Sequence, residues 1–351
     1  MKAYKIQIYI QVKCKFCNRI DARKYKNMQL LLFPIISAFA LLGGSSKNDR
    51  NGRMFSAMAA KGKVILVTGG NRGVGLAICN EILSSPKFGD DDILYLGSRN
   101  FVRGLEVIES EIVHKAKLNQ VQAIQIDVTD QLSVEHCQET IQSDLEDNDR
   151  ELYAIVNNAG GYAGADIQAT LDINIYGMKR VTEAFLPLIA KGGRMVNIGS
   201  AGGPNYVAAQ PEGVRKFLTD KSITWKQCEE YMKKCVMEGA TEGNEWRLGY
   251  GLSKAMVNCY TMILARENKD IRINAVTPGY IETDLTRPAA ERANKTPEEM
   301  GMKKPEFGAK APVQILFSEN VGHGWYYGSD AKRSPIDRYR SPGDPEYVEE
   351  E

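Results

Sequence analysis

The clearest indication of the fold is one short segment, Lys63-Val64-Ile65-Leu66-Val67-Thr68-Gly69-Gly70-Asn71-Arg72-Gly73-Val74-Gly75. Its first half is a β-branched apolar run, which is typical of a strand buried on both faces. Its second half is a glycine-rich loop, and the apolar pattern after it, from Val74 to Leu83, has helical spacing. Strand, glycine loop and helix in this order predict the first unit of an α/β fold.

The alternation of strand and helix continues toward the C-terminus. A second helical pattern runs from Val181 to Ile189. Strands that alternate with helices predict right-handed crossovers and a doubly wound parallel sheet in one domain, residues 62–328. Five further strands are predicted: 93–96, 121–126, 153–157, 195–198 and 271–276.

Charge divides the chain into two parts. Of its 351 residues, 43% are hydrophobic and 25% charged, which excludes wholesale disorder. The overall net charge of +1 gives no argument for nucleic acid or an anionic membrane as a partner. Residues 1–63 carry a net charge of +11, and the remainder carries −10. The first part, residues 1–61, is therefore interpreted as an N-terminal extension.

Three interpretations of this extension stay open. Basic residues precede an apolar run from Leu30 to Leu42, which is too short to span a bilayer and contains Pro34. This order resembles a targeting segment, which would imply an organelle or secretory route and no stable membrane association of the mature domain. Residues 1–57 could instead be a spurious extension, which would favour a cytoplasmic protein, or a folded part of the domain.

The glycine loop predicts a dinucleotide site. Glycines after the first strand let the backbone approach a pyrophosphate at the N-terminus of the next helix. The loop lacks the Gly-Lys-Ser/Thr ending of a P-loop NTPase. The second strand ends in Ser98-Arg99-Asn100, without the carboxylate that would bind a ribose 2′-hydroxyl. Arg99 and Arg72 could bind a 2′-phosphate instead, which predicts NADP(H) as the cofactor.

Besides the glycine loop, a second candidate functional motif is Tyr250-Gly251-Leu252-Ser253-Lys254. Positions i and i+4 lie on one helix face. An ammonium about 4 Å from a phenol, at an effective dielectric of ~20, favours the phenolate by roughly 4 kcal/mol. We therefore expect Lys254 to lower the pKa of Tyr250 by about three units, toward the range useful for proton transfer.

These motifs together resemble the short-chain dehydrogenase/reductase family over residues 62–330. The resemblance rests on the glycine loop, Asn157-Asn158-Ala159-Gly160, Asn174, Ser200 and the Tyr250/Lys254 pair, with Pro278-Gly279 and Thr283 after the last predicted strand. It implies a Rossmann-type sheet and hydride transfer with a nicotinamide cofactor. It also implies the cofactor-binding residues Gly69, Asn71, Arg72, Gly73, Val74, Gly75, Arg99, Asp127, Val128, Asn158, Ala159, Gly160, Tyr250, Lys254, Pro278, Gly279, Ile281 and Thr283.

The resemblance also implies catalytic roles. Tyr250 would donate a proton, Ser200 would bind the carbonyl oxygen, and Lys254 would lower the pKa of Tyr250 and bind the nicotinamide ribose. Asn174 would hold a water that links Lys254 to solvent. The long spacing from Ser200 to Tyr250 is similar to that of the carbonyl reductases, so a small ketone, aldehyde or quinone is the expected substrate. A sugar-nucleotide epimerase and a non-catalytic NADP-binding regulator remain as alternatives.

The long spacing is an insertion, residues 201–249. Thr224-Trp225-Lys226-Gln227 predicts a capping box. An amphipathic helix should follow, whose apolar face either packs on the domain and walls a substrate pocket or binds a partner. We expect the first, and with it a monomer, because the face would cover the surface through which many family members associate. Its apolar stripe is Cys228, Tyr231, Met232, Cys235 and Val236.

Two further expectations concern metals and the C-terminus. The three histidines are scattered, and Cys14 and Cys17 have no second pair at ligand spacing, so no metal site is predicted. The tail, residues 329–351, is rich in proline and charge and is expected to be extended and solvated.

Overall fold

The computed structural model describes residues 62–239 and 245–349. The chain divides into two compact units, residues 1–57 and 58–351. The N-terminal extension of residues 1–61, with its three interpretations, lies outside the described residues. None of the helices in the described ranges is long and apolar enough to cross a membrane.

The described chain contains one eight-stranded sheet of order β3-β2-β1-β4-β5-β6-β7-β8. Every neighbouring pair is parallel except β7 and β8, which are antiparallel. The doubly wound α/β prediction and its six strands are confirmed; two short edge strands were not predicted. The strands are β1 (Val64–Val67), β2 (Ile93–Ser98), β3 (Val121–Gln125), β4 (Leu152–Asn157), β5 (Ile189–Ile198), β6 (Arg272–Val276), β7 (Tyr326–Tyr327) and β8 (Arg333–Ser334).

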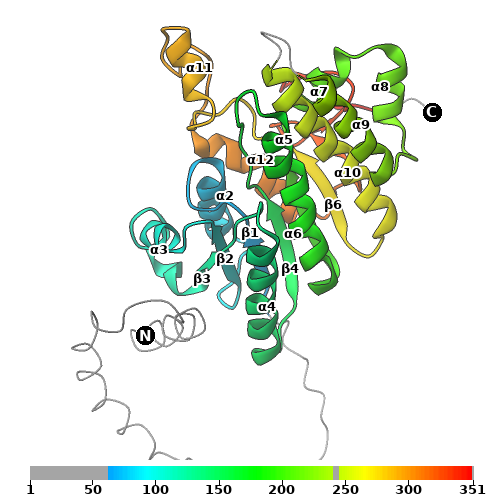
Figure 1. Ribbon diagram of the computed structural model, residues 1–351. Helices are drawn as coiled ribbons and strands as arrows, with labels where there is room; N and C mark the ends of the chain where they lie inside the picture. Colours follow the sequence, from blue (N-terminus) through cyan, green and yellow to red (C-terminus); the bar gives the residue numbers. More distant parts are fainter. Residues whose placement is uncertain (1–61, 240–244, 350–351) are drawn as a thin grey trace, which may run out of the picture. The chain divides into compact units, whose positions relative to one another are not determined.

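Helices cover both faces of this sheet (Figure 1). Helices α4, α6 and α10 belong to one layer, and α2, α3 and α12 to the other. The α-helices are α2 (Gly73–Ser84), α3 (Phe101–Ser110), α4 (Gln131–Asp147), α5 (Ile167–Leu171), α6 (Gly177–Phe185), α7 (Gly202–Ala208), α8 (Glu212–Thr219), α9 (Trp225–Glu238), α10 (Leu252–Glu267), α11 (Arg287–Arg292) and α12 (Pro305–Phe317). Shorter helical turns are η3 (Lys115–Gln120), η4 (Asp172–Tyr176), η5 (Leu186–Leu188) and η6 (Arg247–Gly251).

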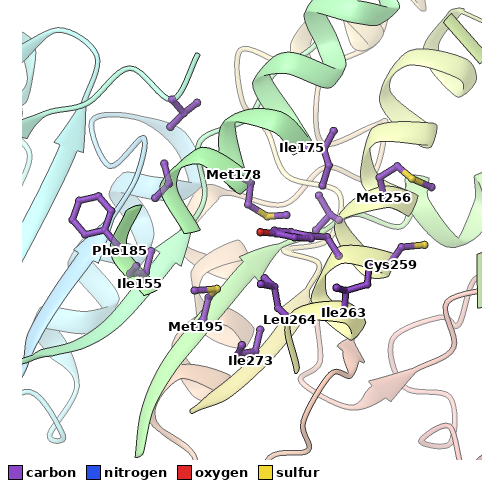
Figure 2. Packing of buried hydrophobic residues seen from close by; sticks show 14 of the residues in the cluster. Ile155, Ile175, Met178, Phe185, Met195, Met256, Cys259, Ile263, Leu264 and Ile273 are labelled. Atoms are coloured by element: carbon purple, nitrogen blue, oxygen red, sulfur yellow. The ribbon is translucent and has the colours of Figure 1, made fainter. Parts of the chain in front are cut away.

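Burial on both faces explains why β1 is continuously apolar. Val64 and Leu66 pack in the layer of α4, α6 and α10, whereas Ile65 and Val67 pack in the layer of α2 and α12. All four side chains are fully buried. Figure 2 shows the first layer, in which side chains of the sheet meet those of α6 and α10, among them Met178, Met195, Ile263, Leu264 and Ile273.

One predicted boundary is wrong. The helical pattern expected to run to Ile189 ends as α6 at Phe185, and Ile189 already begins β5. Pro187 lies between them, in the short turn η5. Because proline lacks an amide hydrogen and clashes with the preceding turn, it terminates the helix there.

The insertion is helical and packs on its own domain. Figure 1 shows α7, α8 and α9 gathered beside α10. The predicted capping box is confirmed: the Thr224 hydroxyl accepts from the Gln227 amide, and the Gln227 side chain accepts from the Thr224 amide. Of the apolar stripe, Cys228, Met232 and Cys235 are buried in the core layer that contains α10.

The C-terminal tail is irregular and partly exposed, as expected, but part of it packs on the domain. Residues 341–346 are exposed, whereas residues 334 and 335 are buried. Residues Arg333 and Ser334 form β8 against β7, and Ser334 is buried. The Arg340 side chain is only 6% exposed. Paired charges that are distant along the tail fold it back onto the domain, and a composition-based prediction cannot detect such pairs.

Candidate functional site

The glycine loop forms a tight turn between β1 and α2. Gly69 and Gly73 have positive φ angles of 64° and 53°, a conformation that glycine adopts without strain. A Cβ atom at Gly75 would lie 2.1 Å from the Gly69 carbonyl oxygen, so only glycine fits there. Arg72 precedes α2 without capping it through its side chain. The first amides of α2 are therefore available to bind an anion such as a pyrophosphate.

A hydrogen-bonded brace joins this loop to the end of β4. The Thr68 hydroxyl accepts from the amides of Asn158 and Ala159, both at 3.0 Å. The Asn158 side-chain amide donates to the carbonyls of Thr68 at 2.9 Å and Gly69 at 3.1 Å. Thr68 was not among the predicted site residues, although a hydroxyl directly before the glycines was the available signal. The brace fixes the two loops that a dinucleotide would contact.

The two arginines lie at the edge of this loop region. Arg99 follows β2 and is exposed. Arg72 is also exposed, and its guanidinium pairs at 2.8 Å with Asp284, in the segment after β6. Arg287 pairs with the same carboxylate and helps to lower the pKa of Asp284. Both arginines are thus accessible to an anionic group, as NADP(H) requires of its 2′-phosphate site.

The remaining predicted cofactor residues follow the carboxyl ends of β1, β3, β4 and β6. Asp127 accepts hydrogen bonds from the amide and hydroxyl of Thr129. Thr283 approaches the glycine loop, because a Cβ at Gly73 would lie 3.4 Å from its methyl group. The others in this group are Asn71, Val74, Val128, Gly160, Pro278, Gly279 and Ile281, of which Val128 and Ile281 are buried.

Ser200, Tyr250, Lys254 and Asn174 come together although they are far apart in sequence. A Cβ at Gly202 would lie 3.4 Å from both the Ser200 hydroxyl oxygen and the Tyr250 ring. A Cβ at Gly160 would lie 3.0 Å from Asn174 Oδ1 and 3.6 Å from Lys254 Nζ. The parallel sheet places the ends of β4 and β5 side by side, and η6 and α10 bring Tyr250 and Lys254 to them.

The electrostatics of the Tyr250/Lys254 pair differ from expectation. Lys254 Nζ donates to the Ile198 carbonyl at 2.8 Å and lies 5.7 Å from the centre of the Tyr250 ring. Burial raises the pKa of Tyr250, and a hydrogen bond with Ser200 opposes that shift. Burial lowers the pKa of Lys254 to about 8. Desolvation therefore sets the direction of both shifts, and the lowered pKa that the spacing predicted for Tyr250 is not found.

Asn174 braces a loop in this structure. Its amide donates to the Gly161 carbonyl and to the Ser253 hydroxyl, both at 2.9 Å, and its oxygen accepts from the Gly161 amide at 2.8 Å. Asn174 lies in the π-helical turn η4, and Tyr250 lies in the π-helical turn η6. Single π-helical turns occur often at functional sites, because they re-aim side chains within a helix.

A cavity of about 330 Å³ opens beside Ser200 and Tyr250. Trp246 lines it and stacks on the Tyr250 ring with a centroid distance of 4.3 Å. Trp246 was not among the predicted site residues, although its position four residues before Tyr250 was a signal. Four further residues that line the same cavity were not predicted either: Tyr280, Tyr326 and the tail residues Tyr339 and Arg340. Within the described ranges, no cluster of histidine, cysteine and acidic side chains could hold a metal ion.

Comparisons with known proteins agree with this geometry. Residues 63–212 match the model of the family described as short chain dehydrogenase. Carbonyl reductase [NADPH] 1 of Homo sapiens is 31% identical over 278 residues, covering 72% of this chain and 90% of the relative. Short-chain dehydrogenase/reductase 1 of Saponaria officinalis is 30% identical over 300 residues, covering 74% and 91%.

Solved structures show the same fold. Salutaridine reductase from Papaver somniferum aligns with a TM-score of 0.60 at 23% identity, covering 76% of this chain and 99% of that one. Since the sheet, the motifs and the curated relatives agree, the chain belongs to the short-chain dehydrogenase/reductase family of oxidoreductases and is a carbonyl reductase-like member of it.

Proposed function

We propose that this protein is an NADPH-dependent reductase of ketone, aldehyde or quinone carbonyls. The observation that carries the proposal is the convergence of Ser200 and Tyr250 on one cavity, with buried Lys254 behind them. The curated relatives support the substrate class and the cofactor, since carbonyl reductases [NADPH] of Homo sapiens and Mus musculus are among them.

The candidate catalytic residues have two kinds of role: some position the substrate and cofactor, and Tyr250 transfers a proton. When bound, the nicotinamide supplies the hydride, and the protein supplies position and electrostatics. Ser200 holds the carbonyl oxygen next to the Tyr250 hydroxyl. Tyr250 donates its proton to that oxygen as the general acid. Because burial raises the pKa of Tyr250 and so weakens it as an acid, this role rests on its position beside Ser200 at the cavity. Lys254 supplies positive charge beside the ribose, and Asn174 fixes the loop at Gly161.

The cavity argues against the sugar-nucleotide epimerase. Arg340 is the one charged side chain among the described residues that line it, and Asp330 already pairs with Arg340. A nucleoside diphosphate substrate would need further cations there. The intact set of Ser200, Tyr250 and Lys254 likewise disfavours a non-catalytic regulator.

NADPH consumption tests the proposal. We expect a panel of carbonyl compounds to include some that oxidise NADPH faster than NADH, measured at the nicotinamide absorbance. Arg99→Asp should weaken NADPH far more than NADH, because it removes a charge-assisted pair and adds repulsion. Arg103→Asp is the matched control: Arg103 is exposed nearby but pairs with Glu111. Equal efficiency with both cofactors in the unmodified protein would contradict the NADPH assignment.

We also propose that the protein is a monomer. The apolar stripe of α9 packs in the core layer with α10, so this insertion covers the helix that carries Lys254. A self-complementary two-fold interface needs that surface to be free. Light scattering over a range of concentrations should give the monomer mass, and a stable dimer would contradict this.

A further inference from the structure

The C-terminal tail contributes a large part of the cavity wall. Ser329, Ser334, Tyr339, Arg340 and Pro342 all line the cavity that Ser200 and Tyr250 open into. These residues follow the last long helix, α12, and belong to none of the motifs from which the family was identified. The wall of the cavity is thus partly built by a segment outside the motifs that bind the expected cofactor.

A buried ion pair closes this tail into a ring. The Arg340 guanidinium pairs with Asp330, and the two side chains are 6% and 20% exposed. Arg340 also donates to the Ser334 hydroxyl at 2.9 Å and to the carbonyls of Ser341 and Asp344. Asp330 accepts in addition from the Gly343 amide at 3.0 Å. The Arg340 guanidinium thus has hydrogen-bond acceptors on several sides, and these bonds tie residues 330–344 together.

A second set of contacts fixes the ends of the ring to the domain. The Arg333 guanidinium lies 4.1 Å from the centre of the Trp325 ring and 5.3 Å from that of Tyr347. It also pairs at 3.0 Å with Glu349, which pairs at 2.6 Å with Lys221 of the insertion. The tail and the insertion are therefore joined, and the wall that they form is held on both sides.

The exposed surface of this wall is aromatic and carries no free charge. Tyr339 is 52% exposed and Trp246 is 43% exposed, although both line the cavity. Large exposed aromatic faces in a concave site are typical of a site that binds an apolar ligand. The charge of Arg340 is neutralised within the tail, so it is not offered to an anionic substrate.

We propose that the tail ring, closed by Arg340 and Asp330, is a substrate-selecting element that uses Tyr339 to favour carbonyl compounds built on rigid apolar rings over small open-chain ones. This rests on the proposed reductase function. Tyr339 contacts the substrate, whereas Arg340 and Asp330 are positioning residues that act through it.

Two vicinal diketones test this: camphorquinone, which is bicyclic, and 2,3-butanedione, which is small and open-chain. We expect the unmodified protein to reduce camphorquinone with the higher kcat/KM. Tyr339→Ala should lower the kcat/KM ratio of camphorquinone to butanedione by about tenfold, mainly through KM, because part of an apolar wall is lost. Arg340→Met should change the ratio in the same direction.

The matched control is Arg338→Met, which removes an exposed tail charge that pairs with its neighbour Asp337 and does not line the cavity. It should leave the ratio unchanged. If Tyr339→Ala leaves the ratio unchanged, the inference is wrong, whether or not the melting temperature falls. If the unmodified protein reduces neither diketone but reduces other carbonyl compounds of the panel, the inference alone is wrong. If it reduces no compound of the panel, the proposed function fails as well.

Discussion

The cofactor side and the substrate side of this site are built by different means. The cofactor side consists of short loops at the carboxyl ends of neighbouring strands, fitted so closely that Gly75 admits no Cβ. The substrate side combines an insertion with a C-terminal tail, held by side-chain pairs such as Arg340 with Asp330. Close backbone packing, together with the Thr68 and Asn158 hydrogen bonds, thus holds the first region in place. In the second region, ion pairs between distant side chains hold the tail beside the short edge strand β8.

Tyr250 lies where the two regions meet, and its loss should have the largest effect. Tyr250→Phe should lower turnover by about 10²–10⁴-fold, because the phenol oxygen is needed for proton transfer. NADPH binding, measured by fluorescence titration, should stay nearly unchanged, since the ring remains. Tyr260→Phe, also in the helical segment around α10 but buried in the core, is the control. Near-normal turnover in Tyr250→Phe would show that the proton donor lies elsewhere.

A pair of glycine substitutions tests the contrast in packing directly. Gly75→Ala should destabilise the protein by about 3 kcal/mol or more, because its Cβ would overlap the Gly69 carbonyl. Gly213→Ala, in α8 of the insertion, has nothing within 4 Å of the added Cβ and should stabilise it by up to about 1 kcal/mol. Chemical denaturation measures both. Equal losses would mean that the two regions are packed alike.

The same contrast explains what the sequence could predict. The run Val64–Val67 and its glycine loop are adjacent along the chain, so periodicity and composition sufficed to predict a doubly wound sheet. Strands β7 and β8 have two residues each, too few for any period. The ion pair between Arg340 and Asp330 forms only when the tail folds, and the pKa of Tyr250 depends on its burial. Neither the ion pair nor the pKa can be predicted from the spacing of residues along the chain.

Lys254 carries a stability cost that should depend on pH. Burial lowers its pKa from 10.5 to about 8, so the folded protein binds this proton less tightly than the unfolded chain. The cost is fully present below pH 8 and disappears as pH rises toward 10.5. Lys254→Met should therefore stabilise the protein at pH 7 by up to about 3 kcal/mol, and by less at pH 10, while it abolishes turnover.

Thermal unfolding of this variant at the two pH values measures the effect. Lys226→Met, at a position whose side chain is 84% exposed, is the control and should show little change at either pH. A Lys254→Met variant that is less stable than the unmodified protein at pH 7 would mean that the hydrogen bond to the Ile198 carbonyl outweighs desolvation.

The smallest expected effect is at the ion pair between Arg72 and Asp284, which joins the glycine loop to the segment after β6. The side chains are 68% and 58% exposed, so the pair is worth at most about 1 kcal/mol. Asp284→Asn should free Arg72 for the 2′-phosphate and lower the Kd for NADPH by no more than about fivefold. The gain should fade in high salt, which screens exposed charges. Glu282→Gln removes a charge from the same segment that pairs with Arg287 rather than Arg72, so it should not reproduce the gain. If Glu282→Gln lowers the Kd for NADPH as much as Asp284→Asn does, the Kd responds to net charge alone. The ion pair between Arg72 and Asp284 would then have no specific effect on cofactor binding.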